Sequence, residues 1–179
     1  MWAEQGKSLG FGEICAEAAK APHFLALINP NLQRFLAPRN MLVEIQGECE
    51  RTGQPVPQGV GPVARCVFES LALAYRQCLE QLEAMTGSKM TRVHIVGGGV
   101  QNKLLSQMTA DACGVPVYAG PVEATAIGNL LVQAIALGAI ADIRQGRSIV
   151  RNTFPLEEYA PQDQAAWRKA WERYAALPG

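Results

Sequence analysis

Three consecutive glycines, Gly97 to Gly99, are the residues of this 179-residue sequence best suited to holding a ligand. They follow a short apolar run and precede a segment with helical spacing, so they occupy a turn between a strand and a helix. Glycine lets a ligand reach the main chain because no Cβ intervenes, and free N–H groups at a helix start suit polar or anionic groups. The turn predicts a ligand at the carboxyl edge of a sheet, although a tight turn alone also explains the glycines.

Two familiar phosphate-binding motifs do not fit this turn. A dinucleotide-binding fingerprint needs glycine where Asn102 stands, and it needs an acid closing the next strand, where this sequence has Gly120 and Pro121. A P-loop needs glycine before its lysine and Ser or Thr after it, whereas Lys103 lies between Asn102 and Leu104. Neither motif is present, so the chemistry of the turn has to come from elsewhere.

A second candidate is the stretch "GPVEATAIGN", residues Gly120–Asn129. Glu123 is expected in the first turn of a helix, where the helix dipole favours a carboxylate, and capping alone explains it equally well. Ala124, Ala126 and Gly128 are small, so this helix is expected to approach its neighbour closely. That approach would hold two strand-to-helix turns in fixed register beside a shared crevice.

The remaining reactive side chains form no catalytic pattern. His94 alternates with apolar residues in a strand, which indicates a structural role, and His23 lies in a loop. Cys49 and Cys66 flank a loop rich in proline and glycine and could lie close together, and the five cysteines are expected to be reduced and mostly buried. The sequence shows no Ser-His-Asp or Cys-His arrangement and no paired carboxylates at catalytic spacing.

Strands and helices must alternate to position these turns. Strands are expected at Val93–Val96 and Val115–Gly120. Helices are expected at 11–21, 41–51, 61–86, about 104–112, 123–137, 142–150 and 162–176. The helix over 123–137 is apolar almost all round, so we expect both its sides to be covered. The pattern predicts one α/β domain over residues 1–179, rich in helix, with a short parallel sheet and a right-handed crossover.

Composition excludes several classes of partner. Lys plus Arg and Asp plus Glu each count 16, and no basic run appears, which argues against a nucleic-acid or membrane surface. The apolar runs fall short of the roughly 20 residues that a membrane span needs. No signal peptide is visible at the N-terminus, so a cytoplasmic location is expected. The expected partner is a small molecule or another protein surface.

Three stretches together carry a resemblance to a known family. "INPNLQRFLAPRNM" (Ile28–Met41), "ARCVFESLALAYR" (Ala64–Arg76) and the long run Val93–Asn129 resemble the C-terminal region of FGGY-family sugar kinases. The resemblance extends over roughly residues 12–160. It implies part of an actin-like, ribonuclease-H-like ATPase lobe, with ATP and Mg²⁺ bound in the cleft between two lobes.

The resemblance also implies a reaction and a place for the nucleotide. These kinases transfer the γ-phosphoryl group of ATP to a primary hydroxyl of a sugar. The loop Ile28–Met41 and the sequence "GPVEAT" resemble the branch of the family that acts on the ketose L-rhamnulose and yields its 1-phosphate. The turn Gly97–Gly99 is then expected against the nucleotide, with Gly98 and Gly99 near the phosphate and ribose and Asn102 near the adenosine.

The sequence also departs from the family pattern, because it lacks everything that precedes the second half of the C-terminal lobe. The missing N-terminal lobe would supply the phosphate-binding hairpin, the acid that binds Mg²⁺ and the aspartate base, so no catalytic residue is expected here. We expect weak nucleotide binding without turnover. A non-catalytic α/β interaction module is the alternative. With two strands predicted, an unpaired sheet edge is expected to associate with a second copy or another molecule.

Overall fold

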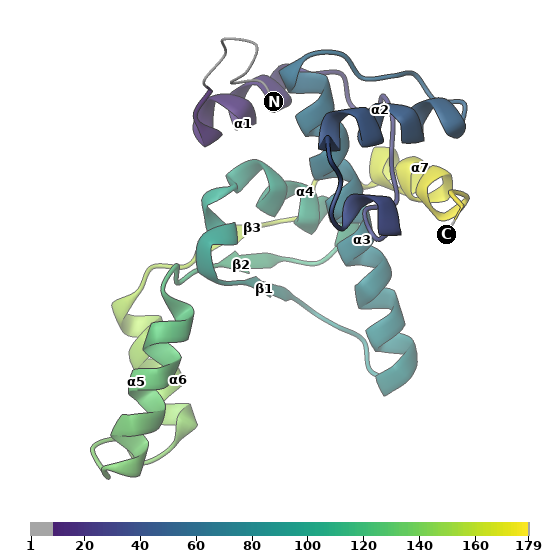
Figure 1. Cartoon of the computed structure of the whole chain (residues 1–179). Coiled ribbons are helices and arrows are strands. Elements are labelled where there is room, and N and C mark those ends of the chain that lie inside the picture. Colours follow the sequence, from purple (N-terminus) through teal and green to yellow (C-terminus); the bar gives the residue numbers. More distant parts are fainter. Residues whose placement is uncertain (1–8, 179) are drawn as a thin grey trace.

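The structure is a computed structural model that describes residues 9–178 (Figure 1). Its three strands are β1 (Val93–Ile95), β2 (Val117–Ala119) and β3 (Glu157–Tyr159). The helices are α1 (Phe11–Lys20), α2 (Met41–Arg51), α3 (Val60–Thr86), α4 (Lys103–Cys113), α5 (Ala124–Ala136), α6 (Ile143–Thr153) and α7 (Gln164–Ala175), with short 3-10 helices η2 (Gln33–Phe35) and η3 (Gly97–Gln101). The predicted helices and both predicted strands are therefore confirmed, with ends that differ by a few residues.

The sheet is mixed, which corrects the prediction of a parallel sheet. β1 and β2 pair in parallel as expected, with α4 as the crossover between them. β3 then pairs with the other side of β2 in the antiparallel direction. β3 has the sequence Glu-Glu-Tyr and leaves both glutamates exposed, so it carries no apolar alternation from which a strand could be predicted.

The long helix α3 organises the core. Its first half contributes buried Val63, Phe68 and Leu73, and α1, α4 and α7 pack around that half. Apolar residues continue along the second half, where Leu82 is 44% exposed and Met85 is 83% exposed. Among the described residues, the buried side chains of α3 therefore all lie in its first half.

A buried ion pair connects the start of α3 to the end of α1 and to the loop that follows α1. Arg65 Nε lies 2.7 Å from Glu69 Oε1, and both side chains are almost fully buried. The guanidinium also donates to the carbonyl oxygens of Ala18 and Ala19 at the end of α1. The second carboxylate oxygen of Glu69 accepts the Phe24 N–H at 2.8 Å. Two charged side chains thus hold α1, the loop after it and α3 together.

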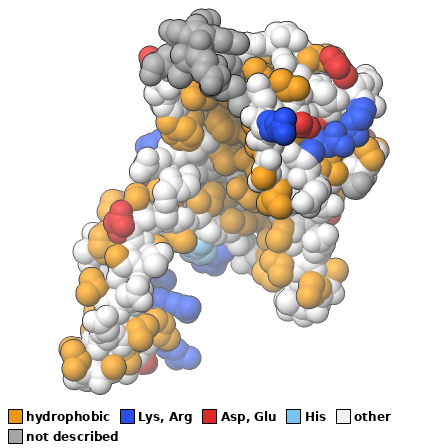
Figure 2. Space-filling model, in the orientation of Figure 1, with side chains coloured by type: hydrophobic (Ala, Val, Ile, Leu, Met, Phe, Trp, Pro, Cys, Tyr) orange, Lys and Arg blue, Asp and Glu red, His pale blue; other side chains and the backbone are white. Residues whose placement is uncertain are grey.

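Helices α5 and α6 form an arm, residues 124–153, that projects away from the sheet (Figure 1). The two helices pack on each other at Gly146, where the side chain of Leu131 lies close to the backbone. A Cβ added at Gly146 would be 3.4 Å from Leu131. No side chain of α5 is buried, and Leu130 and Val132 are 65% and 62% exposed. The expectation that this helix is covered on both sides is wrong for the described chain, and Figure 2 shows hydrophobic side chains along the arm.

Two sequence expectations concern cysteines and membranes. All five cysteines are free, and Cys49 and Cys66 lie together in the second core cluster. A hydrogen bond with Cys49 and burial both raise the pKa of the Cys66 thiol. Cys49 and Cys66 are buried, Cys15 and Cys113 are half-buried, and Cys78 is exposed.

None of the helices in the described part of the chain is long and apolar enough to cross a membrane.

Candidate nucleotide-binding site

The carboxyl ends of β1 and β2 lie side by side, which brings the two candidate turns together. Ile95 pairs with Ala119 at the end of the parallel register. Gly120 N donates to Ile95 O at 2.9 Å, and Gly97 N donates to Pro121 O at 3.1 Å. The predicted neighbourhood of the turns is confirmed, but backbone hydrogen bonds create it. The small residues of α5 do not, since a Cβ added at Gly128 meets nothing within 4 Å.

The three glycines differ in why glycine is needed. Gly97 has φ +76°, a left-handed conformation that disfavours any other residue. A Cβ added at Gly99 meets Ile95 Cγ2 at 3.7 Å, an ordinary contact. A Cβ added at Gly98 meets nothing within 4 Å, so open space lies in front of that backbone. Turn geometry therefore accounts for Gly97, and Gly98 is where a ligand could approach the main chain.

Asn102 has a structural task. Its side-chain oxygen accepts the Leu105 N–H at 3.0 Å and caps the start of α4. The same oxygen accepts the thiol of Cys15 at 3.7 Å, and Asn102 is only 5% exposed. This oxygen therefore already accepts two hydrogen bonds from within the protein. The expected contact between Asn102 and adenosine stays a prediction.

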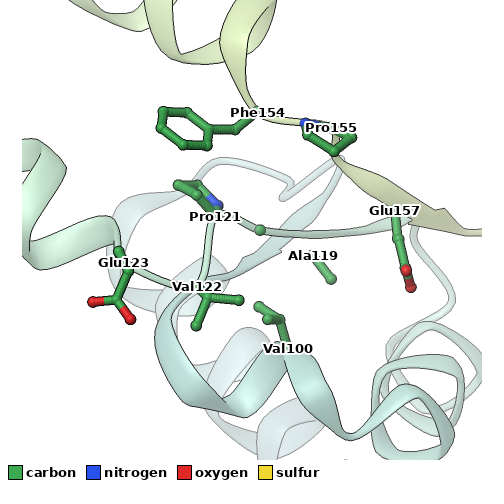
Figure 3. Close-up of a pocket in the computed structure, with 9 residues that line it drawn as sticks. Val100, Ala119, Pro121, Val122, Glu123, Phe154, Pro155 and Glu157 are labelled. Atoms are coloured by element: carbon green, nitrogen blue, oxygen red, sulfur yellow. The ribbon is translucent and has the colours of Figure 1, made fainter.

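A cavity of about 300 Å³ opens beside the two turns (Figure 3). Val100 comes from η3, and Ala119 to Glu123 come from the end of β2 and the turn after it. The opposite wall is formed by Phe154 and Pro155 in the connection from α6 to β3, with Glu157 at the start of β3. The lining is mostly apolar, which suits a flat organic ring better than a phosphate group.

The two acids at this cavity have different surroundings. Glu157 forms an ion pair with Lys103 at 2.6 Å and accepts the Tyr159 hydroxyl at 2.5 Å. The hydrogen bond from Lys103 lowers the pKa of Glu157. Burial, and then the hydrogen bond to Glu157, raise the pKa of Tyr159 to about 12. Glu123 is the N-cap residue of α5, one position before the first turn in which it was expected, and its side chain makes no capping hydrogen bond.

Sequence reasoning missed one wall of the cavity. Phe154, Pro155 and Glu157 reach it because β3 pairs with β2 next to the turn at Gly120. A Phe-Pro pair after a helix signals only the end of that helix. The described residues contain no group of three or more His, Cys, Asp or Glu side chains placed to hold a metal ion.

Comparison with known proteins places this geometry in a family. Residues 2–137 match the model for the FGGY family of carbohydrate kinases, C-terminal domain. A rhamnulokinase from Bacteroides thetaiotaomicron is 44% identical over 176 residues, which cover 96% of this chain and 36% of that protein. The chain thus spans about a third of the length of such relatives.

Solved structures share the fold. A xylulose kinase from Rhodospirillum rubrum superposes on 98% of this chain with a TM-score of 0.65 and 20% identity, using 35% of its own length. A Plasmodium falciparum glycerol kinase solved with ADP gives a TM-score of 0.67 over 97% of this chain at 16% identity, again using 35% of its own length. The fold is that of part of an actin-like ATPase lobe of the kind found in sugar kinases, as expected. The chain belongs to the FGGY family of carbohydrate kinases and corresponds to the C-terminal domain of that family.

Proposed function

We propose that this chain is the nucleotide-binding C-terminal part of a rhamnulokinase-type kinase. In the proposed reaction, the γ-phosphoryl group of ATP moves to the primary hydroxyl of L-rhamnulose or a related ketose and gives the sugar 1-phosphate. One observation carries the proposal: the glycine turn, whose backbone is open at Gly98, is hydrogen-bonded through Gly97 to Pro121, which lines an apolar cavity at the carboxyl edge of two parallel strands. The 44% identity to rhamnulokinases supports this choice of sugar.

The charges around the site favour one orientation of the nucleotide. Glu123 borders the cavity and would repel phosphate groups, whereas the apolar lining of the cavity suits an uncharged base. The base would therefore enter between Phe154 and Val100. The ribose and phosphates would then lie toward Gly98 and Gly99, since a Cβ added at Gly98 would meet nothing within 4 Å. Asn102 would contribute through its amide nitrogen and by fixing the start of α4.

Mg²⁺ would accompany the phosphates of ATP and neutralise their charge. We expect its protein ligands, and the base that removes the proton from the sugar hydroxyl, in the part of the kinase that this chain does not contain. Phosphoryl transfer needs groups positioned on both sides of the reacting phosphate. The chain alone should therefore bind nucleotide weakly and should not phosphorylate a ketose. Ketose-dependent ATP hydrolysis by the purified chain would contradict this expectation.

Replacing Gly98 by valine should weaken nucleotide binding at least about tenfold, equivalent to roughly 1.4 kcal/mol. The new side chain would fill the open space where the nucleotide is proposed to touch the backbone. Fold stability should change little, because nothing lies within 4 Å of the added Cβ. Titration with a fluorescent ADP and thermal unfolding measure the two effects separately.

Gly47 in α2 provides the matched control for this variant, because a Cβ added there also meets nothing within 4 Å. Gly47→Val should bind ADP like the unchanged chain. Absence of saturable binding by the unchanged chain at millimolar nucleotide would count against the site. Collapse of stability in Gly98→Val alone would favour the interpretation that the glycines only form a turn.

Replacing Phe154 by alanine should also weaken ADP binding, by about 1 to 3 kcal/mol, if its ring stacks on the base. That range corresponds to roughly a fivefold to 150-fold rise in the dissociation constant. Phe35 is the control, because it is also a half-buried aromatic residue but does not line the cavity. It packs against the core cluster that contains Cys49 and Cys66. Equal affinities for Phe154→Ala and Phe35→Ala would show that the base does not use this cavity.

A further inference from the structure

The side chain of Asn102 is buried, yet only one end of its amide group has partners among the described residues. Asn102 is 5% exposed. Its Oδ1 atom accepts the Leu105 N–H at 3.0 Å and the Cys15 thiol at 3.7 Å. Its Nδ2 atom donates to none of the described residues. Buried polar side chains normally have hydrogen-bond partners, so this unused donor calls for a partner from outside the described chain.

The partners of Oδ1 determine which way the amide group faces. The oxygen and nitrogen of an asparagine amide are told apart by their hydrogen bonds. The Leu105 N–H can only donate, so the atom that faces it has to be the oxygen. Burial raises the pKa of the Cys15 thiol, which keeps this thiol protonated and able to donate to the same oxygen. The amide nitrogen is therefore directed away from both donors.

The second donor restricts a torsion that the first leaves free. The χ2 torsion of asparagine has a broad energy profile, so a single hydrogen bond to Oδ1 allows the amide plane to rotate about the bond that joins it to Cβ. The Cys15 thiol adds a second fixed point from another helix, 87 residues away in the sequence. Freedom that a side chain loses in the free protein is not lost again when a ligand binds.

The helix that carries Cys15 is itself held firmly in place. α1 is tied to α3 by the buried ion pair described above. Gly61 of α3 comes so close to α1 that an added Cβ would lie 2.6 Å from the carbonyl oxygen of Glu17. Cys15 also packs against the main core cluster. The fold therefore presents the thiol to Asn102 at a fixed position.

We propose that Cys15 is a positioning residue for the nucleotide site. Its thiol holds the Asn102 amide so that Nδ2 offers a hydrogen-bond donor to the nucleotide. The backbone N–H of Asn102 donates to Gly99 O at 3.2 Å, which places this residue directly at the glycine turn. The amide suits a neutral acceptor, either a ring nitrogen of the base or an oxygen of the ribose. The inference rests on the proposed nucleotide binding and gives α1 a part in it without any contact with the nucleotide.

Valine and serine at position 15 separate positioning from simple packing. A cysteine that only fills the core is replaced better by apolar valine than by serine. A positioning cysteine gives the opposite order in ADP affinity, because serine keeps a donor and valine does not. Cys15→Val should lower the affinity at least about threefold, and Cys15→Ser should stay within about twofold of the unchanged chain. Titration with a fluorescent ADP measures the affinities, and thermal unfolding ranks the stabilities.

Cys113 provides the matched controls, because it is also half-buried, ends α4 and makes no side-chain hydrogen bond to a described residue. Cys113→Val and Cys113→Ser should both bind ADP like the unchanged chain. Cys15→Ala also removes the donor, and it replaces Cys15→Val in the comparison if valine prevents folding.

The side-chain amide of Asn102 gives a second readout that a packing role would not move. In the ¹⁵N-labelled chain, ADP should shift the Nδ2 signals of Asn102, which an Asn102→Asp variant identifies by their loss. That shift should persist in Cys15→Ser and should become smaller in Cys15→Val.

Two outcomes would overturn this role while leaving nucleotide binding intact. The first is equal ADP affinity of Cys15→Val and Cys15→Ser, which would make Cys15 a packing residue. The second is ADP binding that leaves the Nδ2 signals of Asn102 unshifted. Failure of the unchanged chain to bind ADP at all would be a different result, because it would contradict the proposed function and remove this role with it.

Discussion

Replacing Arg65 by methionine should lower the free energy of unfolding by about 3 to 5 kcal/mol, the usual loss when one partner of a buried ion pair is removed. The variant leaves the Glu69 carboxylate buried without its counter-charge. It also leaves the carbonyl oxygens of Ala18 and Ala19 without this donor. Denaturant unfolding followed by circular dichroism measures the loss.

Arg76→Met on the same helix is the matched control, because Arg76 pairs with Glu80 at the same spacing of four residues. That pair is partly exposed, and loss of such a pair usually costs about 1 kcal/mol or less. Arg76 also lies over the Trp171 ring at 4.6 Å, which adds roughly 0.5 to 1 kcal/mol. Equal losses for Arg65→Met and Arg76→Met would contradict the role assigned to burial.

The loss in Arg65→Met should depend on pH in a definite direction. Burial raises the pKa of Glu69 in the folded chain, while Arg65 lowers it, so removing Arg65 raises that pKa further. A carboxyl group whose pKa is higher in the folded state binds more protons there, and stability falls as pH rises from the unfolded pKa through the folded pKa. The deficit of Arg65→Met relative to the unchanged chain should therefore be smaller at acidic pH than at neutral pH.

Replacing Gly61 by alanine should destabilise the fold by about 1 to 3 kcal/mol, the range for overpacking a tight contact. A Cβ at Gly61 would lie 2.6 Å from the carbonyl oxygen of Glu17 and 3.0 Å from its carbon. Those atoms belong to the backbone of α1, so the two helices would have to separate. Thermal or denaturant unfolding gives the size of the effect.

Gly47→Ala in α2 should have the opposite sign, because a Cβ there meets nothing within 4 Å. Alanine inside a helix is favoured over glycine by roughly 0.5 to 1 kcal/mol, so this variant should gain stability. A gain in stability for Gly61→Ala as well would mean that α1 does not pack against α3 as closely as described.

Local sequence signals predicted the fold wherever a segment carries its own pattern. The glycine turn after Val93–Ile95 and the Gly120-Pro121 pair after Val117–Ala119 mark both parallel strands. β3 carries no such pattern, because its glutamates are exposed and its pairing with β2 alone makes it a strand. The exposure of α5 could not be predicted either. The apolar composition of a helix indicates that it packs against another element, but it does not show whether that element is present in the described structure.

The candidate site divides in the same way. Gly98 could be found from sequence because glycine runs are rare and have a physical meaning. Phe154 could not, because it reaches the cavity only through the pairing of β3, which no local pattern announces. Asn102 caps α4, a role that the sequence analysis did not assign to it, and its expected contact with adenosine stays a prediction.

The arm joins the rest of the protein through the two opposite walls of the cavity. α5 begins directly after Glu123 on one wall, and α6 ends directly before Phe154 on the other. Any rotation of the arm about these two attachments would therefore change the width of the cavity between Pro121 and Phe154. A molecule bound between the two walls would restrict such a rotation, and the orientation of the helix pair would then depend on whether the cavity is filled.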